Sequence, residues 1–489
     1  MRPANQKSFL LKTLSISLLI ASVIYSLLYA TDSTNQSMYP FYPSLIQWKK
    51  SDVEFKPPEN CADCHAEKYE EWNGSVHSMA FQDPIYHGEL NKARQSAGKD
   101  IARQCEGCHT PVGMITGEIN RSDFNKLGPV ASSGVSCDVC HSISGHTHWQ
   151  TPYHQPENGS MILENGQNTP NGMMPVKRGP LKADENCGDE FHVCAESSLH
   201  KSTELCASCH QVNHYEVHTP LEATYMEWKN GPYAVNGITC QDCHMVELPT
   251  FMRSADHFEK PKQGDYRHYF SGANFTLYSM LQRAAERVQD ETKLANAKRQ
   301  YDMAVKRLQS CADIEVTPIY TNKKIEQVRI RVKNIRAGHN LPTSLTTVRQ
   351  VWLELTVKDA KNKVVMESGL VTKTGELQSN TRIFNSEGMG KNLQFSYNPW
   401  EIIAFSKHDT IPPKGFKDVY FPLHVPETIQ TVSVDVKLRY RIADQHLADL
   451  LLKSVPADID LNKIYGINQV SPLPIVDMLH KQINIQNKL

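Results

Sequence analysis

The sequence predicts an α+β fold in which a mainly helical and loop domain, rich in cysteine and histidine, precedes an antiparallel β-sandwich. Two observations support this prediction. Twelve of the 13 cysteines and 16 of the 21 histidines fall before residue 271. After residue 312 the apolar residues change from helical spacing to alternation with polar residues, which is typical of half-buried strands. With 489 residues, the chain is long enough for two or three domains.

The charge balance excludes two broad classes of protein. The chain has 52 basic and 53 acidic residues, and its formal net charge is −1. A strongly basic nucleic-acid binder and an acidic, solvating chain are both excluded by this balance. We therefore expect no nucleic-acid partner.

The N-terminal 30 residues have the layout of an export segment. Residues 13–30 are an uncharged, mostly apolar run of 18, and Arg2, Lys7 and Lys12 precede it. The run is either a signal peptide cleaved after Ala30 or a membrane anchor, because Leu28 at the −3 position is not small. The preceding positive charges predict that the rest of the chain lies in the periplasm or at the cell surface. Residues 31–58 are predicted to form a linker.

Ten cysteines form five Cys-x-x-Cys-His units. Two thiols a short turn apart reach the two vinyl groups at one edge of a porphyrin, and the adjacent histidine then faces the iron. A zinc site or a redox disulfide would not require histidine at this position in all five units. The sequence therefore predicts five covalently bound haem c groups in a multihaem cytochrome c domain over residues 59–275. The attachment residues are Cys61, Cys64, Cys105, Cys108, Cys137, Cys140, Cys206, Cys209, Cys240 and Cys243, and the iron ligands are His65, His109, His141, His210 and His244.

The three remaining cysteines have no such pattern. Cys187 and Cys194 bracket a short loop that also holds His192, and a disulfide is expected between them in an oxidising compartment. Cys311 is predicted to be a buried, small apolar residue.

The second axial ligand of each iron cannot be assigned by counting, because eleven further histidines precede residue 271 and His339 is a twelfth candidate. His77 follows His65 by 12 residues on a segment with a helical pattern, about 18 Å of rise, so it would serve a different haem. His214 stands four residues after His210. If the segment is helical, the two share one face and His214 would also serve a neighbouring haem. His148, in a histidine-rich stretch, is a further candidate.

Two stretches repeat within the domain. Ala131-x-x-Gly134-Val135-Ser136-Cys137-x-x-Cys140-His141 matches Ala234-x-x-Gly237-Ile238-Thr239-Cys240-x-x-Cys243-His244. Tyr69-x-Glu71-Trp72-Asn73-Gly74 also has a short echo in Tyr225-x-Glu227-Trp228-Lys229-Asn230-Gly231. These matches suggest a two-haem module copied in tandem, and closely packed haems suit electron hopping.

The second half carries no catalytic constellation. Residues 276–312 have helical spacing and predict a long helix or a helix pair. Residues 313–440 hold alternating runs, such as Val328 to Val332 and Val351 to Val357, and predict the β-sandwich. Residues 441–489 are assigned to a C-terminal tail. No nucleophile elbow is present, so Ser-His-Asp chemistry is not expected.

The chain resembles the multihaem c-type cytochromes that include the tetrahaem electron acceptor of hydroxylamine oxidoreductase, in a subgroup with a C-terminal β-sandwich. The matching stretches are Cys61 to His77, Gly134 to His141, Tyr225 to Met245, Arg267 to Asn274 and Gly338 to Thr343. The resemblance implies that His77, His268 and His339 are distal iron ligands and that the chain transfers electrons. The chain departs from its better-known relatives in having five units in place of four or eight. It also lacks the Cys-x-x-Cys-Lys unit of pentahaem nitrite reductases.

Three functions agree with these features. The first is an exported pentahaem cytochrome that passes electrons along its haems between redox partner proteins. The second is a multihaem oxidoreductase that acts on a small nitrogen or sulfur compound at one open haem. The third is a self-associating subunit of an extracellular cytochrome filament. The sequence leaves open whether the chain is an enzyme.

Overall fold

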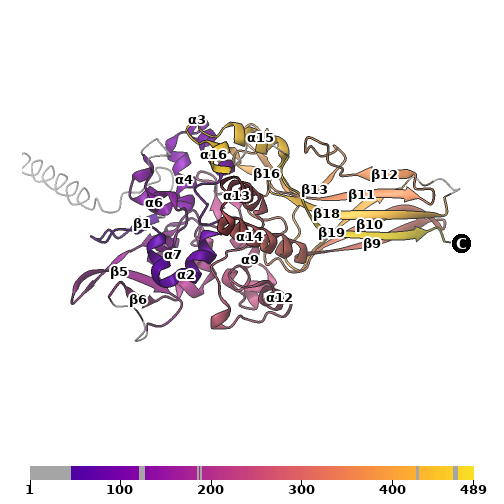
Figure 1. The fold of residues 1–489 in the computed structure, drawn as a ribbon. Coiled ribbons are helices and arrows are strands. Elements are labelled where there is room, and N and C mark those ends of the chain that lie inside the picture. The colour runs from indigo at the N-terminus through magenta and orange to yellow at the C-terminus, as the bar shows by residue number, and fades with distance from the viewer. Residues whose placement is uncertain are drawn as a thin grey trace, which may run out of the picture.

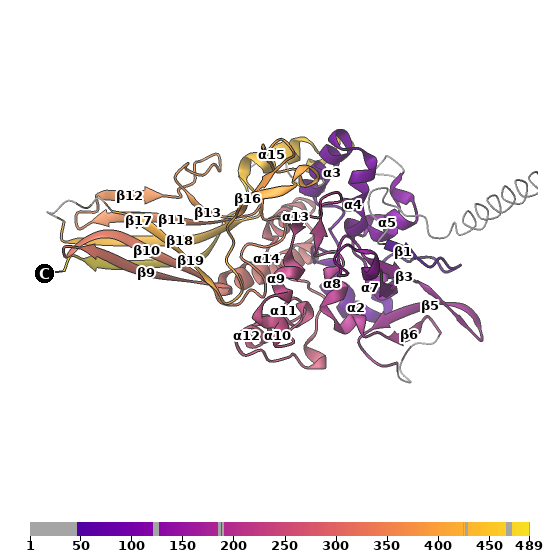
Figure 2. The same cartoon turned by 180° about the vertical axis from the view of Figure 1, so that it is seen from behind.

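The computed structural model describes residues 46–120, 127–183, 187, 190–423, 425, 429–465 and 472–488. A helical, cysteine-rich half lies at one end of the molecule and long β-strands extend from it to the other end (Figure 1; Figure 2 shows the opposite side). The predicted export segment at 13–30 lies outside the described residues. Among the residues that are described, no helix is long and apolar enough to cross a membrane.

Each Cys-x-x-Cys-His unit lies in a helix or begins in one. The helices that carry the units are α2 (Glu59–Asn73), α4 (Lys99–His109), α7 (Cys137–Ser142), α8 (Thr203–Ala207) and α11 (Cys240–His244). Helix α2 is kinked at His65, whose φ of −117° and ψ of 45° are not helical. The kink separates the first unit from the rest of α2, which continues to Asn73 as the sequence predicts.

Short strands connect these helices. β1 (Ile46–Trp48) and β2 (Ile143–His146) flank β3 (Met161–Leu163). A second small sheet has the order β4 (Gly166–Thr169), β5 (Gly172–Gly179), β6 (Val193–Glu196). α3 (Pro84–Ser96) packs near α4 around a core that includes Leu90, Met114 and Leu163.

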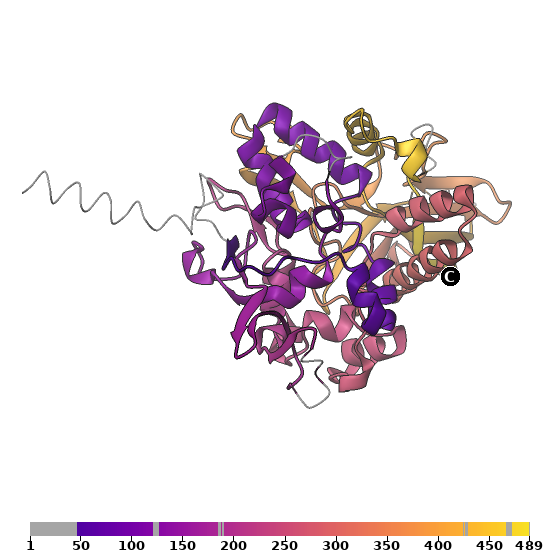
Figure 3. The ribbon, with the colours of Figure 1, turned by 60° about the vertical axis from the view of Figure 1, so that its left-hand side comes forward.

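A helix pair joins the two halves. α13 (Phe275–Val288) begins at Asn274, whose side chain accepts a hydrogen bond from the Leu277 amide, and α14 (Glu291–Ser310) begins at Asp290 in the same manner. The two helices lie beside the cysteine-rich half (Figure 3). Phe275 and Tyr278 of α13 are fully buried in the core that also contains the sandwich strands.

The C-terminal half is an antiparallel β-sandwich. One sheet has the order β17 (Phe416–Pro422), β10 (Lys324–Asn334), β9 (Ala312–Thr321). The other has the order β12 (Val364–Ser368), β11 (Gln350–Asp359), β18 (Thr431–Arg441), β19 (Val476–Gln486), and β13 (Arg382–Phe384) also pairs with β11. The alternating residues of the predicted strands, including Val328, Ile330 and Leu353, fill the space between the sheets. The predicted α+β fold class is therefore confirmed.

The last 49 residues are not a simple tail. β19 pairs with β18 along ten positions of register, from Thr431 with Gln486 to Tyr440 with Val476. α15 (Gln445–Lys453) packs against α3 of the cysteine-rich half, and the Asn91 amide donates a hydrogen bond to the Ser454 carbonyl at 2.8 Å. The C-terminal segment thus completes the sandwich and ties it back to the first half.

Candidate haem sites

The ten cysteines of the five units are all free thiols in the structure, whereas Cys187 and Cys194 form a disulfide, which confirms that prediction. Thiols from different units lie close enough to interact electrostatically. The pairs are Cys61 with Cys137, Cys108 with Cys209, and Cys206 with Cys240. Cys140 of the third unit also lies close to Cys206 and Cys209 of the fourth. These interactions place the first unit beside the third, the third beside the fourth, and the fourth beside both the second and the fifth. The five units therefore form one contiguous cluster.

Hydrogen bonds orient the motif histidines for metal binding. The Nδ1 atoms of His109, His141 and His244 lie 2.6, 2.6 and 2.7 Å from the backbone carbonyl oxygens of Ala80, Arg178 and Ser271. Because a carbonyl can only accept, Nδ1 carries the proton and Nε2 keeps its lone pair. This is the arrangement in which a second hydrogen bond fixes the tautomer of a metal ligand.

His210 has a carboxylate partner instead. Its Nδ1 lies 3.2 Å from Oε1 of Glu222. Burial lowers the pKa of His210, but the hydrogen bond to Glu222 and the negative charge of that carboxylate together with nearby thiols outweigh burial, so the pKa is raised overall. A carboxylate behind a ligating histidine increases its basicity as a ligand. The fourth unit therefore differs electrostatically from the second, third and fifth.

Two motif histidines face the distal histidines that the resemblance implies. A metal–imidazole bond is about 2 Å long, so two imidazoles on opposite sides of one iron have ring centroids about 6 Å apart. The centroids of His77 and His210 are 6.2 Å apart, and those of His244 and His339 are also 6.2 Å apart. His339 Nδ1 lies 2.9 Å from the Asn340 carbonyl oxygen, which again leaves Nε2 for a metal.

The third unit has two imidazoles at this spacing. The His141 ring centroid lies 5.9 Å from that of His200 and 6.4 Å from that of His268. His200 Nε2 lies 3.0 Å from the Cys140 carbonyl oxygen and must donate to it. His268 has its Nδ1 3.7 Å from Oε2 of Glu71, so Nε2 is left for the iron. The geometry favours His268, the residue that the resemblance implies.

The first unit faces a histidine outside the predicted set. The ring centroids of His65 and His192 are 6.5 Å apart. The signal that could have identified His192 was its place inside the loop bracketed by Cys187 and Cys194, but that pattern alone does not say which haem the loop approaches.

The second unit is different. The ring stacked on His109 belongs to Tyr86, with centroids 3.9 Å apart and an interplanar angle of 8°. The Tyr86 hydroxyl is buried without a hydrogen-bond partner in the part of the chain that the structure describes. Nearby on the same helix, burial raises the pKa of Glu89 to about 7. Among the described residues, the ring stacked on the second motif histidine is thus a phenol with a buried carboxyl group nearby, whereas each of the other four motif histidines has an imidazole about 6 Å away.

The two remaining predicted ligands have other surroundings. His214 lies between β7 (Val212–Asn213) and β8 (Pro220–Glu222), so the segment is not helical. Its Nε2 lies 3.0 Å from the Trp400 carbonyl oxygen, and its Nδ1 accepts hydrogen bonds from two backbone amides. His148 is buried and stacks on His146 at 3.8 Å, and its Nε2 has no hydrogen-bond partner among the described residues. Both assignments stay predictions.

The residues present fit covalently attached haem. The cysteines are free, the motif histidines present Nε2, and four of these histidines have a second imidazole at the separation that one iron requires. Each haem would be held by its two cysteines and its motif histidine, and would supply one-electron redox chemistry.

Comparisons with known proteins agree with this chemistry. Residues 60–142, which hold the first three units, match the family described as Cytochrome c554 and c-prime. No curated protein matches the chain. The fold is similar to the crystal structure of a penta-heme cytochrome c552 from Thermochromatium tepidum, with a TM-score of 0.57 and 16% sequence identity over 88% of this chain and 100% of that chain. The chain is therefore a multihaem c-type cytochrome whose residues 60–142 fall in the cytochrome c554 and c-prime family.

Proposed function

We propose that this protein is an exported pentahaem cytochrome that carries single electrons along a connected row of haems between redox partner proteins. The observation that carries the proposal is the close approach of thiols from different units. It links the first unit to the third, the third to the fourth, and the fourth to the second and the fifth. Thioethers lie at the edges of their haems, so units whose cysteines touch hold their haems close together. Short gaps between redox centres favour electron transfer over chemistry at one isolated centre.

The chain's own residues set the character of each site. In the proposal, His77, His268 and His339 fill the distal positions opposite His210, His141 and His244. Two histidine ligands close an iron to substrates and make a low-spin electron carrier. Burial lowers the pKa of His77 to about 3 and also lowers the pKa of His339, which keeps these two imidazoles uncharged. His214, whose two ring nitrogens are engaged by backbone groups, is not part of the proposed ligand set.

The proposal is tested on holo-protein made with a haem-attachment system. Intact mass should show five haems, and low-temperature EPR should show low-spin iron at the third, fourth and fifth units. The His268→Ala variant should convert one haem to high spin, whereas the matched His200→Ala variant should not. Fewer than five attached haems, or a haem that cannot exchange electrons with the others during stepwise reduction, would contradict the proposal.

A second candidate function rests on the second unit. Tyr86 stacks face to face on His109, so it lies on the same side of a haem as His109 and does not take the opposite position. In this second candidate that position is open to substrate, and the nearby Glu89, whose pKa is raised, donates protons. Such a site suits reduction or oxidation of a small nitrogen or sulfur compound. EPR spectra with and without nitrite, hydroxylamine, cyanide and carbon monoxide decide between the two. A high-spin signal that shifts with these ligands supports an enzyme, and spectra that none of them changes support the carrier alone.

A further inference from the structure

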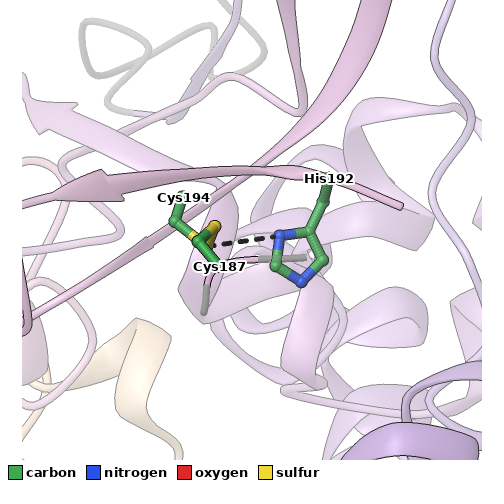
Figure 4. A group of neighbouring side chains, drawn as sticks. All are labelled: Cys187, His192 and Cys194. Carbon is green, nitrogen blue, oxygen red and sulfur yellow. Dashed lines mark hydrogen bonds between the residues drawn. A yellow bond between two sulfur atoms is a disulfide. The ribbon is translucent and has the colours of Figure 1, made fainter. Parts of the chain in front are cut away.

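The loop that precedes β6 places an imidazole opposite the first unit. His192 lies one residue before β6, and its ring centroid is 6.5 Å from that of His65. His192 Nδ1 lies 3.7 Å from Sγ of Cys194, on the side of the ring where the Cys187–Cys194 disulfide runs (Figure 4). With Nδ1 beside the sulfur, Nε2 is the nitrogen left for a metal.

The sheet beneath this loop is fixed to the third unit. β6 pairs with β5 in a parallel register that sets Val193 opposite Val176 and Cys194 opposite Lys177. The Lys177 ammonium forms an ion pair with Asp138 inside the third unit. The strand that follows His192 is therefore held in place from one side by β5.

The same sheet also reaches the chain just before the first unit. The Asp138 carboxylate that pairs with Lys177 accepts a hydrogen bond from the Lys56 amide at 2.7 Å. The Arg178 carbonyl, next along β5, is the acceptor for His141 Nδ1. β5 thus contacts the third unit, which adjoins the chain that leads into the first unit, and β6 is paired with β5. This arrangement explains how a residue 127 positions after His65 comes to face it.

We propose that His192 is the sixth ligand of the haem bound at Cys61 and Cys64, and that the Cys187–Cys194 disulfide keeps it on the iron. This inference rests on the proposed function, because it needs a haem at the first unit. β6 holds the chain on the C-terminal side of His192, and the disulfide restrains its N-terminal side. Without the disulfide, only β6 restrains the imidazole. The imidazole would then leave the iron for part of the time, and the sixth position would be open.

The chemistry that would release the ligand is thiol–disulfide exchange with a dithiol reductant. The dithiol provides two electrons and two protons, the bond between the two sulfurs breaks, and two thiols form at Cys187 and Cys194 while the reductant leaves as its own disulfide. The first haem would then accept an external ligand. His65 and Cys64 are exposed, so such a ligand can approach from solvent.

The test uses holo-protein whose haem content is measured first by intact mass. The His192→Ala variant should have one more high-spin haem in its EPR spectrum than the wild type, and added imidazole should return that haem to low spin. The matched control is His154→Ala, which removes an exposed histidine of the same domain and should leave the spectrum unchanged. If His192→Ala fails to attach five haems, His192→Met serves instead, and a new methionine–iron charge-transfer band is expected.

The disulfide is tested in a second arm. Cys187→Ser/Cys194→Ser protein, and wild type treated with dithiothreitol, capped with iodoacetamide and reoxidised with ferricyanide, should both show a partial high-spin signal that imidazole removes. Five haems with an unchanged spectrum in His192→Ala, or no methionine–iron band in His192→Met, would overturn the assignment of His192 and leave the proposed function standing. An unchanged spectrum in both disulfide arms would overturn the role of the disulfide. A wild type without haem at the first unit would instead contradict the proposed function.

Discussion

The two Tyr-x-Glu-Trp segments of the chain make equivalent hydrogen bonds at two different candidate haem sites. Trp72 of α2 donates its indole N–H to the Val135 carbonyl at 2.8 Å, and Trp228 of α9 (Thr224–Lys229) donates to the Ile238 carbonyl at 2.8 Å. Each acceptor stands two residues before the first cysteine of a unit, the third or the fifth. The short sequence echo is thus matched by equivalent contacts.

The glutamates beside these tryptophans are also equivalent. Glu71 accepts a hydrogen bond from the His268 amide at 2.8 Å, and Glu227 accepts one from the Asn340 amide, the residue after His339, at 3.1 Å. Each carboxylate therefore holds the backbone that carries a proposed distal ligand. The repeated module consists of a helix, an attachment unit and the segment of its distal histidine.

The two modules differ in charge. Glu71 is buried, with 3% of its side chain exposed, and lies 3.2 Å from the Lys68 ammonium and 3.5 Å from the Arg267 guanidinium. Glu227 has neutral partners, the Thr343 hydroxyl at 2.5 Å and the Asn340 amide. Burial raises the pKa of both, but for Glu71 the hydrogen bonds from His268 and Lys68 outweigh burial, and the pKa is lowered. The same backbone arrangement therefore surrounds Glu71 with charged partners and Glu227 with neutral ones.

The largest difference in stability between the two modules is expected when the paired glycines, Gly134 and Gly237, are replaced by alanine. Both have positive φ, +60° and +70°, so alanine is strained at either position. A Cβ at Gly134 would lie 2.6 Å from the His77 carbonyl oxygen, whereas the nearest atom at Gly237 is Cε of Lys260 at 3.7 Å. We expect Gly134→Ala to cost about 3 kcal/mol, from strain and overpacking together, and Gly237→Ala about 1 kcal/mol from strain alone.

Guanidinium unfolding of the two holo-proteins, followed by far-UV circular dichroism, measures these costs. Because Gly134→Ala pushes on the backbone of His77, its EPR spectrum should also show a change in the haem that His77 is proposed to ligate. Equal losses of stability in the two variants would mean that the glycines are needed only for their backbone conformation.

A smaller difference in unfolding free energy is expected when the two carboxylates are replaced by glutamine. Glu71→Gln leaves Lys68 and Arg267 beside a buried neutral amide and should cost about 2 kcal/mol, because a buried charge pair loses one partner. Glu227→Gln keeps an acceptor for its neutral partners and should cost less than about 1 kcal/mol. A double-mutant cycle of Glu71→Gln with Arg267→Gln measures the ionic share by denaturant unfolding. A coupling near zero would show that Glu71 acts only as a hydrogen-bond acceptor.

Much of this arrangement follows from local sequence signals. Some features are determined by residues that lie close together in the sequence: the attachment units, the alternating strands such as Val351 to Val357, and the Cys187–Cys194 disulfide. The structure contains those strands and that disulfide. The place of β19 was not predictable, because its pairing with β18 depends on strands that only the fold brings together.

The distal sites show the same limit. His192 meets His65 across 127 positions, and the choice between His200 and His268 at the third unit depends on which ring nitrogen is already hydrogen-bonded. His214 would share a face with His210 only if the segment were helical, but the chain forms a hairpin there and backbone groups hydrogen-bond to both of its ring nitrogens. Spacing in the sequence therefore predicts the residues that attach haem, and tertiary contacts decide which of the other histidines faces each motif histidine.

The smallest expected effect is a pH dependence of the unfolding free energy that comes from Glu227, the carboxyl group with neutral partners. Burial raises the pKa of Glu227 from its ordinary value of 4.5 to about 7, despite hydrogen bonds from Thr343 and Asn340. Between these two values the unfolded chain has released the proton and the folded chain still holds it, so rising pH favours unfolding. The stabilisation is complete below pH 4.5 and is lost as the pH passes through 7. The free energy of unfolding of the wild type minus that of Glu227→Gln should therefore fall by about 1 kcal/mol across this window, a value reduced from the full linkage by solvent screening of a half-buried group.

Urea unfolding at a series of pH values measures the difference, and the corresponding difference for Glu71→Gln should not fall, because the pKa of that carboxyl is lowered. If the Glu227 difference stays flat, the carboxyl group titrates normally, and the contrast between the two modules is one of hydrogen-bond partners alone.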